Sequence, residues 1–294
     1  MELVTVSVCP SNTSSSGHPS ETLSWNVREF INAVVLGLGF LLGFPGNIAV
    51  IIHKPNIQHL SPVTQSLMLS LAVSDLLCLL TIPFGMYALL VSWTLGPVTC
   101  KLLTYLSFVS IYVSLMTVTD SVQHYLVVVK QRNTLNLFGP KLLLVLLWPV
   151  SLILSIPALV VLKDDHDEHW VRCIFQFSSR TQKLAVLLTE TLVGFASCFV
   201  VAFSYIQLYR KVNRAAFFNN PQTSRLVTSI IIVFFFLWIP YLTVNVLVMA
   251  DPALHNGRLS ESLAELHRII KALLFINSCL NPLLYAFTSH ICKC

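Results

Sequence analysis

The chain has 294 residues, of which 55% are hydrophobic and only 11% are charged. Soluble globular domains carry roughly 25% charged residues, so this composition excludes an ordinary water-soluble domain. It indicates a protein whose main solvent is lipid.

Apolar runs long enough to cross a bilayer recur along the chain. A hydrocarbon core of about 30 Å needs roughly 20 apolar residues in a helix. Seven runs meet this length, at residues 30–52, 64–90, 102–129, 142–162, 184–209, 226–249 and 266–288. Because the connections are short, no separate soluble domain has room to fold. We therefore predict an all-α membrane protein. Its seven-helix transmembrane bundle spans 30–288, between an N-terminal tail at 1–29 and a short cytoplasmic tail at 289–294.

Basic residues predict the orientation of this bundle, because Lys and Arg are retained in cytoplasmic loops. With the N-terminus outside, the cytoplasmic segments contain no acidic residue and carry Lys54, Lys130, Arg132, Lys141, Arg210, Lys211, Arg214, Arg225 and Lys293. We therefore expect a multi-pass plasma-membrane protein with an extracellular N-terminus. The net charge of +5 reflects this topology and not a nucleic-acid partner. Asn12 begins an Asn-Thr-Ser glycosylation acceptor on the outer side.

Two cysteines fall on the oxidising side of this topology. Cys100 lies at the outer end of the third span, and Cys173 lies in the connection after the fourth. Disulfides form in extracellular compartments, so we predict a bond between these two residues.

Polar residues inside the spans predict a buried cluster. An ionisable side chain in a span costs roughly 2.5 to 3.5 kcal/mol, so it should face the bundle interior and have a partner. Asp75 lies in the middle of the second span, and the polar residues expected at similar depth include Ser114, Asn277, Ser278 and Asn281. Such a carboxylate can hold a sodium ion or a proton, and we expect no other cofactor. The alternative is a purely structural hydrogen-bond cluster.

Prolines interrupt two spans beside large side chains. Trp238 precedes Pro240 in the sixth span, and Asn281 precedes Pro282 in the seventh. A proline within a helix removes one hydrogen bond and kinks the helix. These positions are therefore candidate hinges, with simple kinked packing as the alternative.

These motifs occur one per span, in a fixed order. They are Gly46-Asn47, Leu71 to Asp75, Trp93 and Gly96 ahead of Cys100, Trp148, Trp238-Ile239-Pro240 and Asn281-Pro282-Leu283-Leu284-Tyr285. Together they resemble the signature of rhodopsin-like (class A) G-protein-coupled receptors. The resemblance implies an extracellular ligand pocket, an outward swing of the sixth span and a cytoplasmic cavity for a heterotrimeric G protein. It assigns an activation switch to Phe234, Tyr205, Trp238, Asn281, Pro282 and Tyr285.

Looser matches narrow the resemblance to chemoattractant receptors, and most closely to leukotriene B4 receptors. They are Phe44-Pro45-Gly46-Asn47, Tyr105 with Tyr112, Glu190 before Gly194-Phe195, and Trp238 to Tyr241 with Asn245. The resemblance implies an anionic lipid ligand, either leukotriene B4 or a related hydroxy fatty acid. A chemoattractant peptide is the alternative ligand.

The distribution of charge fits such a ligand. A basic rim over an aromatic shaft suits an anionic amphiphile, whose carboxylate accepts a charge-assisted bond from Lys or Arg. The predicted ligand-binding residues are Lys101, Tyr105, Tyr112, Glu190, Trp238, Tyr241, Asn245 and Arg268. Lys163, Arg172 and Lys271 also lie on the rim, where interfacial anchoring is the alternative role.

One motif departs from the family pattern. The Asp-Arg-Tyr triplet that contacts the G protein is here Gln123-His124-Tyr125. Asp120 lies four residues before His124 and three before Gln123, so a helix places it against either side chain, and an Asp120–His124 pair would replace the lost charge contact. The missing arginine predicts weakened coupling or a non-signalling decoy, whereas the alternative is a tolerated variant.

Other classes of membrane protein are not supported. An enzyme needs a catalytic constellation, and the chain has no His-Glu-x-x-His run and no paired carboxylates within one span. A transporter predicts related broken helices in its two halves, and no such similarity is present.

Overall fold

The computed structural model describes residues 27–53, 62–90, 93–130, 140–166, 171–175, 179–212, 221–254 and 257–290. These residues form α1 (Val27–His53), α2 (Pro62–Leu90), α3 (Gly96–Lys130), α4 (Pro140–Leu154), α5 (Ile156–Val161), β1 (Leu162–His166), β2 (Val171–Phe175), α6 (Arg180–Val212), α7 (Pro221–Leu254) and α8 (Gly257–His290).

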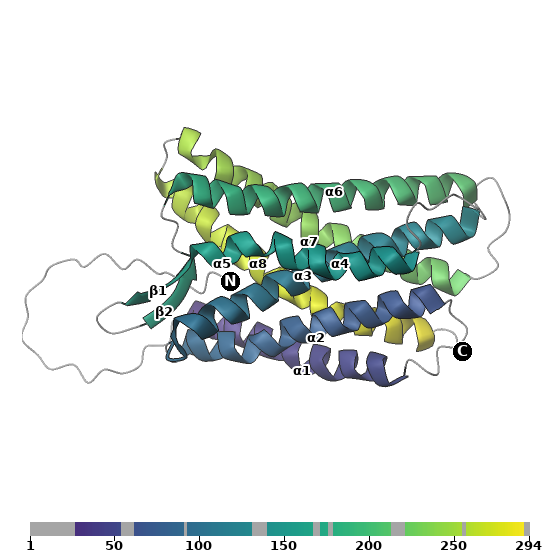
Figure 1. Ribbon diagram of the computed structural model, residues 1–294, viewed down its shortest axis with the longest axis horizontal. Coiled ribbons are helices and arrows are strands. Elements are labelled where there is room, and N and C mark those ends of the chain that lie inside the picture. Colours follow the sequence, from purple (N-terminus) through teal and green to yellow (C-terminus); the bar gives the residue numbers. More distant parts are fainter. Residues whose placement is uncertain are drawn as a thin grey trace, which may run out of the picture.

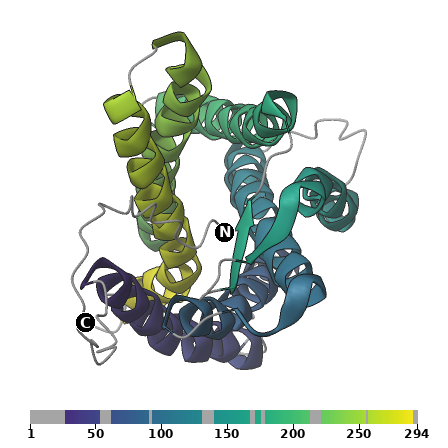
Figure 2. The same cartoon turned by 90° about the vertical axis from the view of Figure 1, so that its left-hand side faces the viewer.

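The helices run side by side as a bundle, with the β1–β2 hairpin at one end (Figure 1). We call this the hairpin end and the opposite one the far end. Viewed from the hairpin end, the helices form a closed ring (Figure 2). Neighbours in the chain are neighbours in the ring, and contacts between α1 and α8 close it. Helix α3 also contacts α6, so it lies where several helices meet.

Each predicted span corresponds to one helix in the described part of the chain, except the fourth, which contains both α4 and α5. Six stretches are long and apolar enough to cross a membrane. The seventh predicted span lies in α8, whose sequence also carries Lys271, Asn277 and Asn281 among its apolar residues. The helices extend beyond the predicted apolar runs, since a helix can continue past the hydrocarbon core into polar surroundings.

The fourth span is divided into α4 and α5. Pro157 has no N–H and cannot bond back to the preceding turn, so the helix is interrupted at Ser155. The chain then leaves the bundle as the β1–β2 hairpin, in which Asp164 pairs with Cys173 and Asp165 with Arg172. This hairpin packs against α3. The sequence does not predict it, because its short strands lack an apolar alternation.

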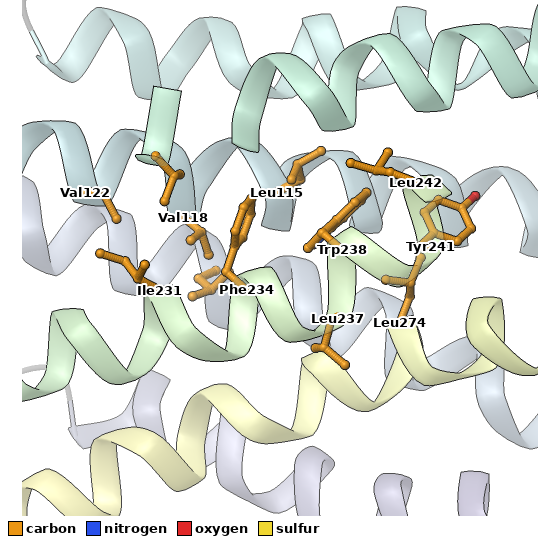
Figure 3. Packing of buried hydrophobic residues seen from close by; sticks show 12 residues of the cluster. Leu115, Val118, Val122, Ile231, Phe234, Leu237, Trp238, Tyr241, Leu242 and Leu274 are labelled. Atoms are coloured by element: carbon orange, nitrogen blue, oxygen red, sulfur yellow. The ribbon is translucent and has the colours of Figure 1, made fainter. Parts of the chain in front are cut away.

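A cluster of apolar side chains fills the centre of the bundle (Figure 3). It contains Leu71, Leu115, Val118, Val122, Val201, Ile231, Phe234, Leu237, Trp238, Tyr241, Leu242 and Leu274. These residues come from α2, α3, α6, α7 and α8, so the cluster joins five helices.

The outer surface is apolar as well. Phe199 on α6 and Phe236 on α7 are among the most exposed side chains, at 72% and 74%. Exposing such rings to water would cost roughly 25 cal/mol per Å² of apolar surface, so this face suits lipid. The interior contains many hydroxyls, and Ser110, Thr119 and Ser151 bond back to the carbonyl four residues earlier. Small polar residues of this kind are typical of contacts between transmembrane helices.

Candidate functional site

The first polar cluster surrounds Asp75 on α2. Its side chain is fully buried, and its Oδ2 accepts a hydrogen bond of 2.7 Å from Asn281 on α8. The Asn277 amide donates to the Ser114 hydroxyl on α3 at 3.3 Å. Ser114 and Ser278 are also buried and lie near the same carboxylate. The structure therefore brings together the five residues that the sequence predicts around a sodium ion or proton.

One atom of this cluster lacks a partner. Among the described residues, Asp75 Oδ1 accepts no hydrogen bond, although it is buried. A buried carboxylate oxygen without a partner is costly, because nothing replaces its hydration. Carboxylate, hydroxyl and amide oxygens are the ligands that hard cations prefer. The donor set thus fits a sodium ion, which would be held by Asp75 with oxygens of Ser114, Asn277, Ser278 and Asn281.

Three predicted switch residues, Trp238, Phe234 and Tyr205, belong to the central apolar cluster or pack against it. Trp238 stacks against Phe234 at 6.2 Å between ring centroids and meets Tyr241 edge-on at 5.9 Å. Tyr205 packs against the same apolar cluster. Pro282 is buried against α1, where a Cβ on Gly46 would lie 2.8 Å from its ring. For Tyr285 the structure describes the backbone only.

A second polar cluster lies between α6, α7 and α8. Glu190 is buried, and its Oε2 accepts hydrogen bonds from the Tyr241 hydroxyl and, at 3.5 Å, from the Asn245 amide. Asn245 Oδ1 lies 2.9 Å from His267 Nε2. The His267 ring stacks on Tyr241 at 5.9 Å and 14°. These residues form a continuous polar chain that ends beside Trp238.

A buried cation completes the cluster. Lys271 Nζ lies 3.5 Å from Glu190 Oε1, and the side chains are 12% and 5% exposed. The same ammonium lies 4.8 Å from the ring centroid of Phe108 on α3. An ammonium over an aromatic face is attracted by the partial negative charge that the ring quadrupole places on that face. Lys271 is therefore an interior residue of the bundle and not a rim anchor.

Other predicted ligand-binding residues lie elsewhere. Tyr112 is buried near Glu190 and packs with Phe108, so it borders the second cluster. The Tyr105 hydroxyl instead donates to the Leu152 carbonyl on α4 at 2.9 Å. Lys101 is exposed near the start of α3. For Arg268 the structure describes the backbone alone.

The predicted Asp120–His124 pair does not form. Within the described residues, these side chains share neither a hydrogen bond nor an ion pair, although both are partly buried. Gln123 lies beside them on α3, and the Tyr125 side chain is outside the described part. A spacing of four residues allows contact on a helix but does not require it.

Cys100 is buried and disulfide-bonded. The side chain of its predicted partner, Cys173, lies outside the described residues, as does Asn12, so the pairing and the glycosylation remain predictions.

The arrangement of the chain agrees with its relationship to known proteins. A family model described as 7 transmembrane receptor (rhodopsin family) matches residues 46–285. The chain belongs to this family. Members of this family are receptors and not enzymes, so the chain is a multi-pass receptor of the plasma membrane, and the family implies a ligand and coupling to a G protein.

Individual relatives are chemoattractant and lipid receptors. Human leukotriene B4 receptor 1 is 29% identical over 94% of this chain and 81% of its own length. Zebrafish (Danio rerio) C5a anaphylatoxin chemotactic receptor 1 is 28% identical over 88% of the chain and 77% of its own length. Human C-C chemokine receptor type 8 is 27% identical over 89% and 76%. The receptor is thus related to chemoattractant and leukotriene receptors.

Three residues of the second cluster are missing from the predicted ligand-binding set: His267, Lys271 and Phe108. His267 and Lys271 are four positions apart, so they share one face of α8. That spacing is a signal that the sequence does contain, because a polar face on a membrane helix should point inward. Phe108 carries no comparable signal, since an aromatic residue suits either lipid or core.

Proposed function

We propose that this receptor recognises an extracellular anionic lipid, leukotriene B4 or a related hydroxy fatty acid, and signals through a heterotrimeric G protein. The observation that carries the proposal is the second polar cluster. It combines a buried cation, Lys271, with the hydrogen-bonding groups of Tyr241, Asn245 and His267 in an aromatic frame. A fatty acid with hydroxyl groups has complementary chemistry: one anionic head, an apolar chain and a few polar groups.

The same cluster favours a small acid over a peptide. Its polar groups are nearly all buried between helices, so a ligand must insert deeply to reach them. The similarity to human leukotriene B4 receptor 1 supports this ligand class. The similarity to the C5a and chemokine receptors leaves a chemoattractant peptide as the competing ligand.

We propose that the N-terminus and the hairpin end face the outside of the cell. Basic residues without acidic neighbours in the connections at the far end support this orientation. The ligand then enters from the hairpin end and the G protein binds at the far end.

A decoy receptor is the second candidate function. It is favoured by Gln123-His124-Tyr125, which lacks the arginine of the family triplet, and by the absence of an ion pair between Asp120 and His124 in the described structure. A receptor of this kind would bind the lipid and fail to activate the G protein.

The test is G-protein dissociation in cells expressing the receptor, over a panel of lipid carboxylates led by leukotriene B4, with saturation binding in parallel. C5a and a chemokine serve as peptide comparisons. Binding with activation supports the signalling lipid receptor, and binding without activation supports the decoy. A response to peptide alone would replace the lipid proposal.

A further inference from the structure

Glu190 and Lys271 face each other deep between the helices. Glu190 lies ten residues into α6 and Lys271 fourteen residues into α8, counted from the hairpin end. At a rise of 1.5 Å per residue these positions are about 15 and 21 Å from the starts of their helices. They form the only ion pair between described residues, and it joins two helices that lie on either side of α7 in the ring.

The contacts of Glu190 are divided between its two oxygens. Oε2 accepts hydrogen bonds from Tyr241 and Asn245 on α7, while Oε1 faces Lys271. The Lys271–Glu190 distance of 3.5 Å exceeds the roughly 2.8 Å of a strong charge-assisted hydrogen bond. Glu190 is therefore bonded mainly to the Tyr241 hydroxyl on α7, whereas its contacts with Asn245 and Lys271 are both 3.5 Å long.

Lys271 likewise has a second source of stabilisation, because its ammonium lies over the Phe108 ring. If another carboxylate replaced Glu190 Oε1, Lys271 would keep its aromatic contact and Glu190 would keep its bonds to Tyr241 and Asn245. The exchange would leave neither group without a partner, which is the usual cost of breaking a buried ion pair.

We propose that Lys271 binds the acid group of the ligand, and that Glu190 is an internal carboxylate that occupies this position in the free receptor. The inference rests on the proposed anionic ligand. Glu190 then acts as a competitor: its negative charge neutralises Lys271 and repels a second carboxylate. Acid binding thus depends on the competition between the Glu190 carboxylate and the ligand carboxylate for Lys271.

Removing the charge of Glu190 and removing the charge of Lys271 should have opposite effects on the affinity for the acid. In Glu190→Gln the amide keeps the size and the contact with Asn245, and the competing charge is gone. We expect this variant to bind leukotriene B4 about tenfold more tightly than the wild type, the size of one charged hydrogen bond. Lys271→Met keeps the length of the side chain without its charge, and we expect binding to weaken about tenfold to a hundredfold.

Saturation binding of leukotriene B4 and of its methyl ester separates recognition from folding. The ester has the same chain and hydroxyls but no negative charge, so its affinity should be equal in all variants.

Because Lys271→Met leaves Glu190 buried without a cation, the double variant Glu190→Gln with Lys271→Met is measured too. It should fold, bind the ester and bind the acid no better than the ester. Lys183→Met, which removes an exposed charge from α6, is the matched control and should change neither affinity.

Three results would overturn the inference while keeping a lipid receptor. Equal loss of acid and ester in the double variant would indicate a structural role. Weaker acid binding by Glu190→Gln would make Glu190 a ligand partner and not a competitor. Normal acid binding by Lys271→Met, with loss in Arg268→Gln, would move the acid site to Arg268. If the wild type binds neither the acid nor the ester, the proposed ligand itself is wrong and the inference fails with it.

Discussion

Two buried carboxylates in this receptor are balanced in different ways. Glu190 has a cation, Lys271, within the protein. Asp75 accepts a hydrogen bond from the neutral amide of Asn281, and among the described residues its Oδ1 accepts none. A buried charge needs a counter-charge or a proton, so we predict that the partner of Asp75 comes from solution.

Sodium should therefore stabilise the receptor through Asp75. A ligand that binds only the folded state raises the melting temperature in proportion to the logarithm of its concentration. We expect the purified wild type to melt several degrees higher in sodium chloride than in choline chloride of equal ionic strength. Asp75→Asn should melt at the same temperature in both salts.

Asn245→Asp offers a control for this measurement, because it adds a carboxylate in the other cluster and leaves Asp75 intact. Its melting temperature should still depend on sodium. A wild type that is indifferent to the choice of cation would favour a proton, or the structural hydrogen-bond cluster, at Asp75.

At the scale of elements, the contact between α1 and α8 depends on glycine. A Cβ on Gly43 would lie 2.7 Å from the Cβ of Cys279 and 3.0 Å from its Cα. Since the nearest atoms belong to the α8 backbone and to a short side chain, they cannot move aside without shifting a helix. Close approach of this kind gives membrane helices much of their packing energy.

Gly43→Ala should consequently destabilise the receptor. We expect a loss of about 1 to 3 kcal/mol from overpacking, seen as a lower melting temperature and reduced surface expression. Gly39→Ala is the matched control on the same helix, since its Cβ would meet Cys279 Sγ at an ordinary 3.7 Å. Both changes gain the same helix propensity, so the difference between them isolates the clash. Equal stability of the two variants would show that α1 and α8 can separate at little cost.

On the scale of the whole molecule, the apolar cluster runs along the centre of the bundle from the second polar cluster toward the far end. It runs from Tyr241, beside the Glu190 chain, through Trp238 and Phe234 to Val122 on α3 (Figure 3). Val122 is adjacent in sequence to Gln123 and His124. A shift of α7 at the proposed ligand site therefore has a packed route to the region proposed to contact the G protein.

We predict that His124 limits the activation of the G protein at the far end of the bundle. We expect His124→Arg to raise ligand-dependent G-protein activation about tenfold, the effect of one added charge-assisted hydrogen bond. Nucleotide exchange on a purified G protein, at saturating ligand, is the measurement. Gln123→Asp alone is the control and should add little, because it does not supply the arginine. Comparable activation by wild type and His124→Arg would mean that Gln123-His124-Tyr125 is a tolerated variant.

Much of the candidate site follows from single residues. Asp75 and Glu190 are recognisable because a charge within an apolar run must face inward, and Asn281 because it accompanies a proline in the last span. The depth at which Asp75, Ser114 and Asn281 meet also follows from their positions within the spans. The Lys271–Glu190 pair does not, because it depends on how α6 and α8 are rotated about their axes.

Local sequence is sufficient to set the number and order of the helices, because the length of an apolar run is a property of neighbouring residues and the bilayer thickness is constant. The rotation of each helix, the inward position of Lys271, the turn of Tyr105 toward α4 and the separation of Asp120 from His124 arise only when all the helices pack together. Helix association in lipid is governed by shape and hydrogen bonding between distant segments, and neither can be read from one segment alone.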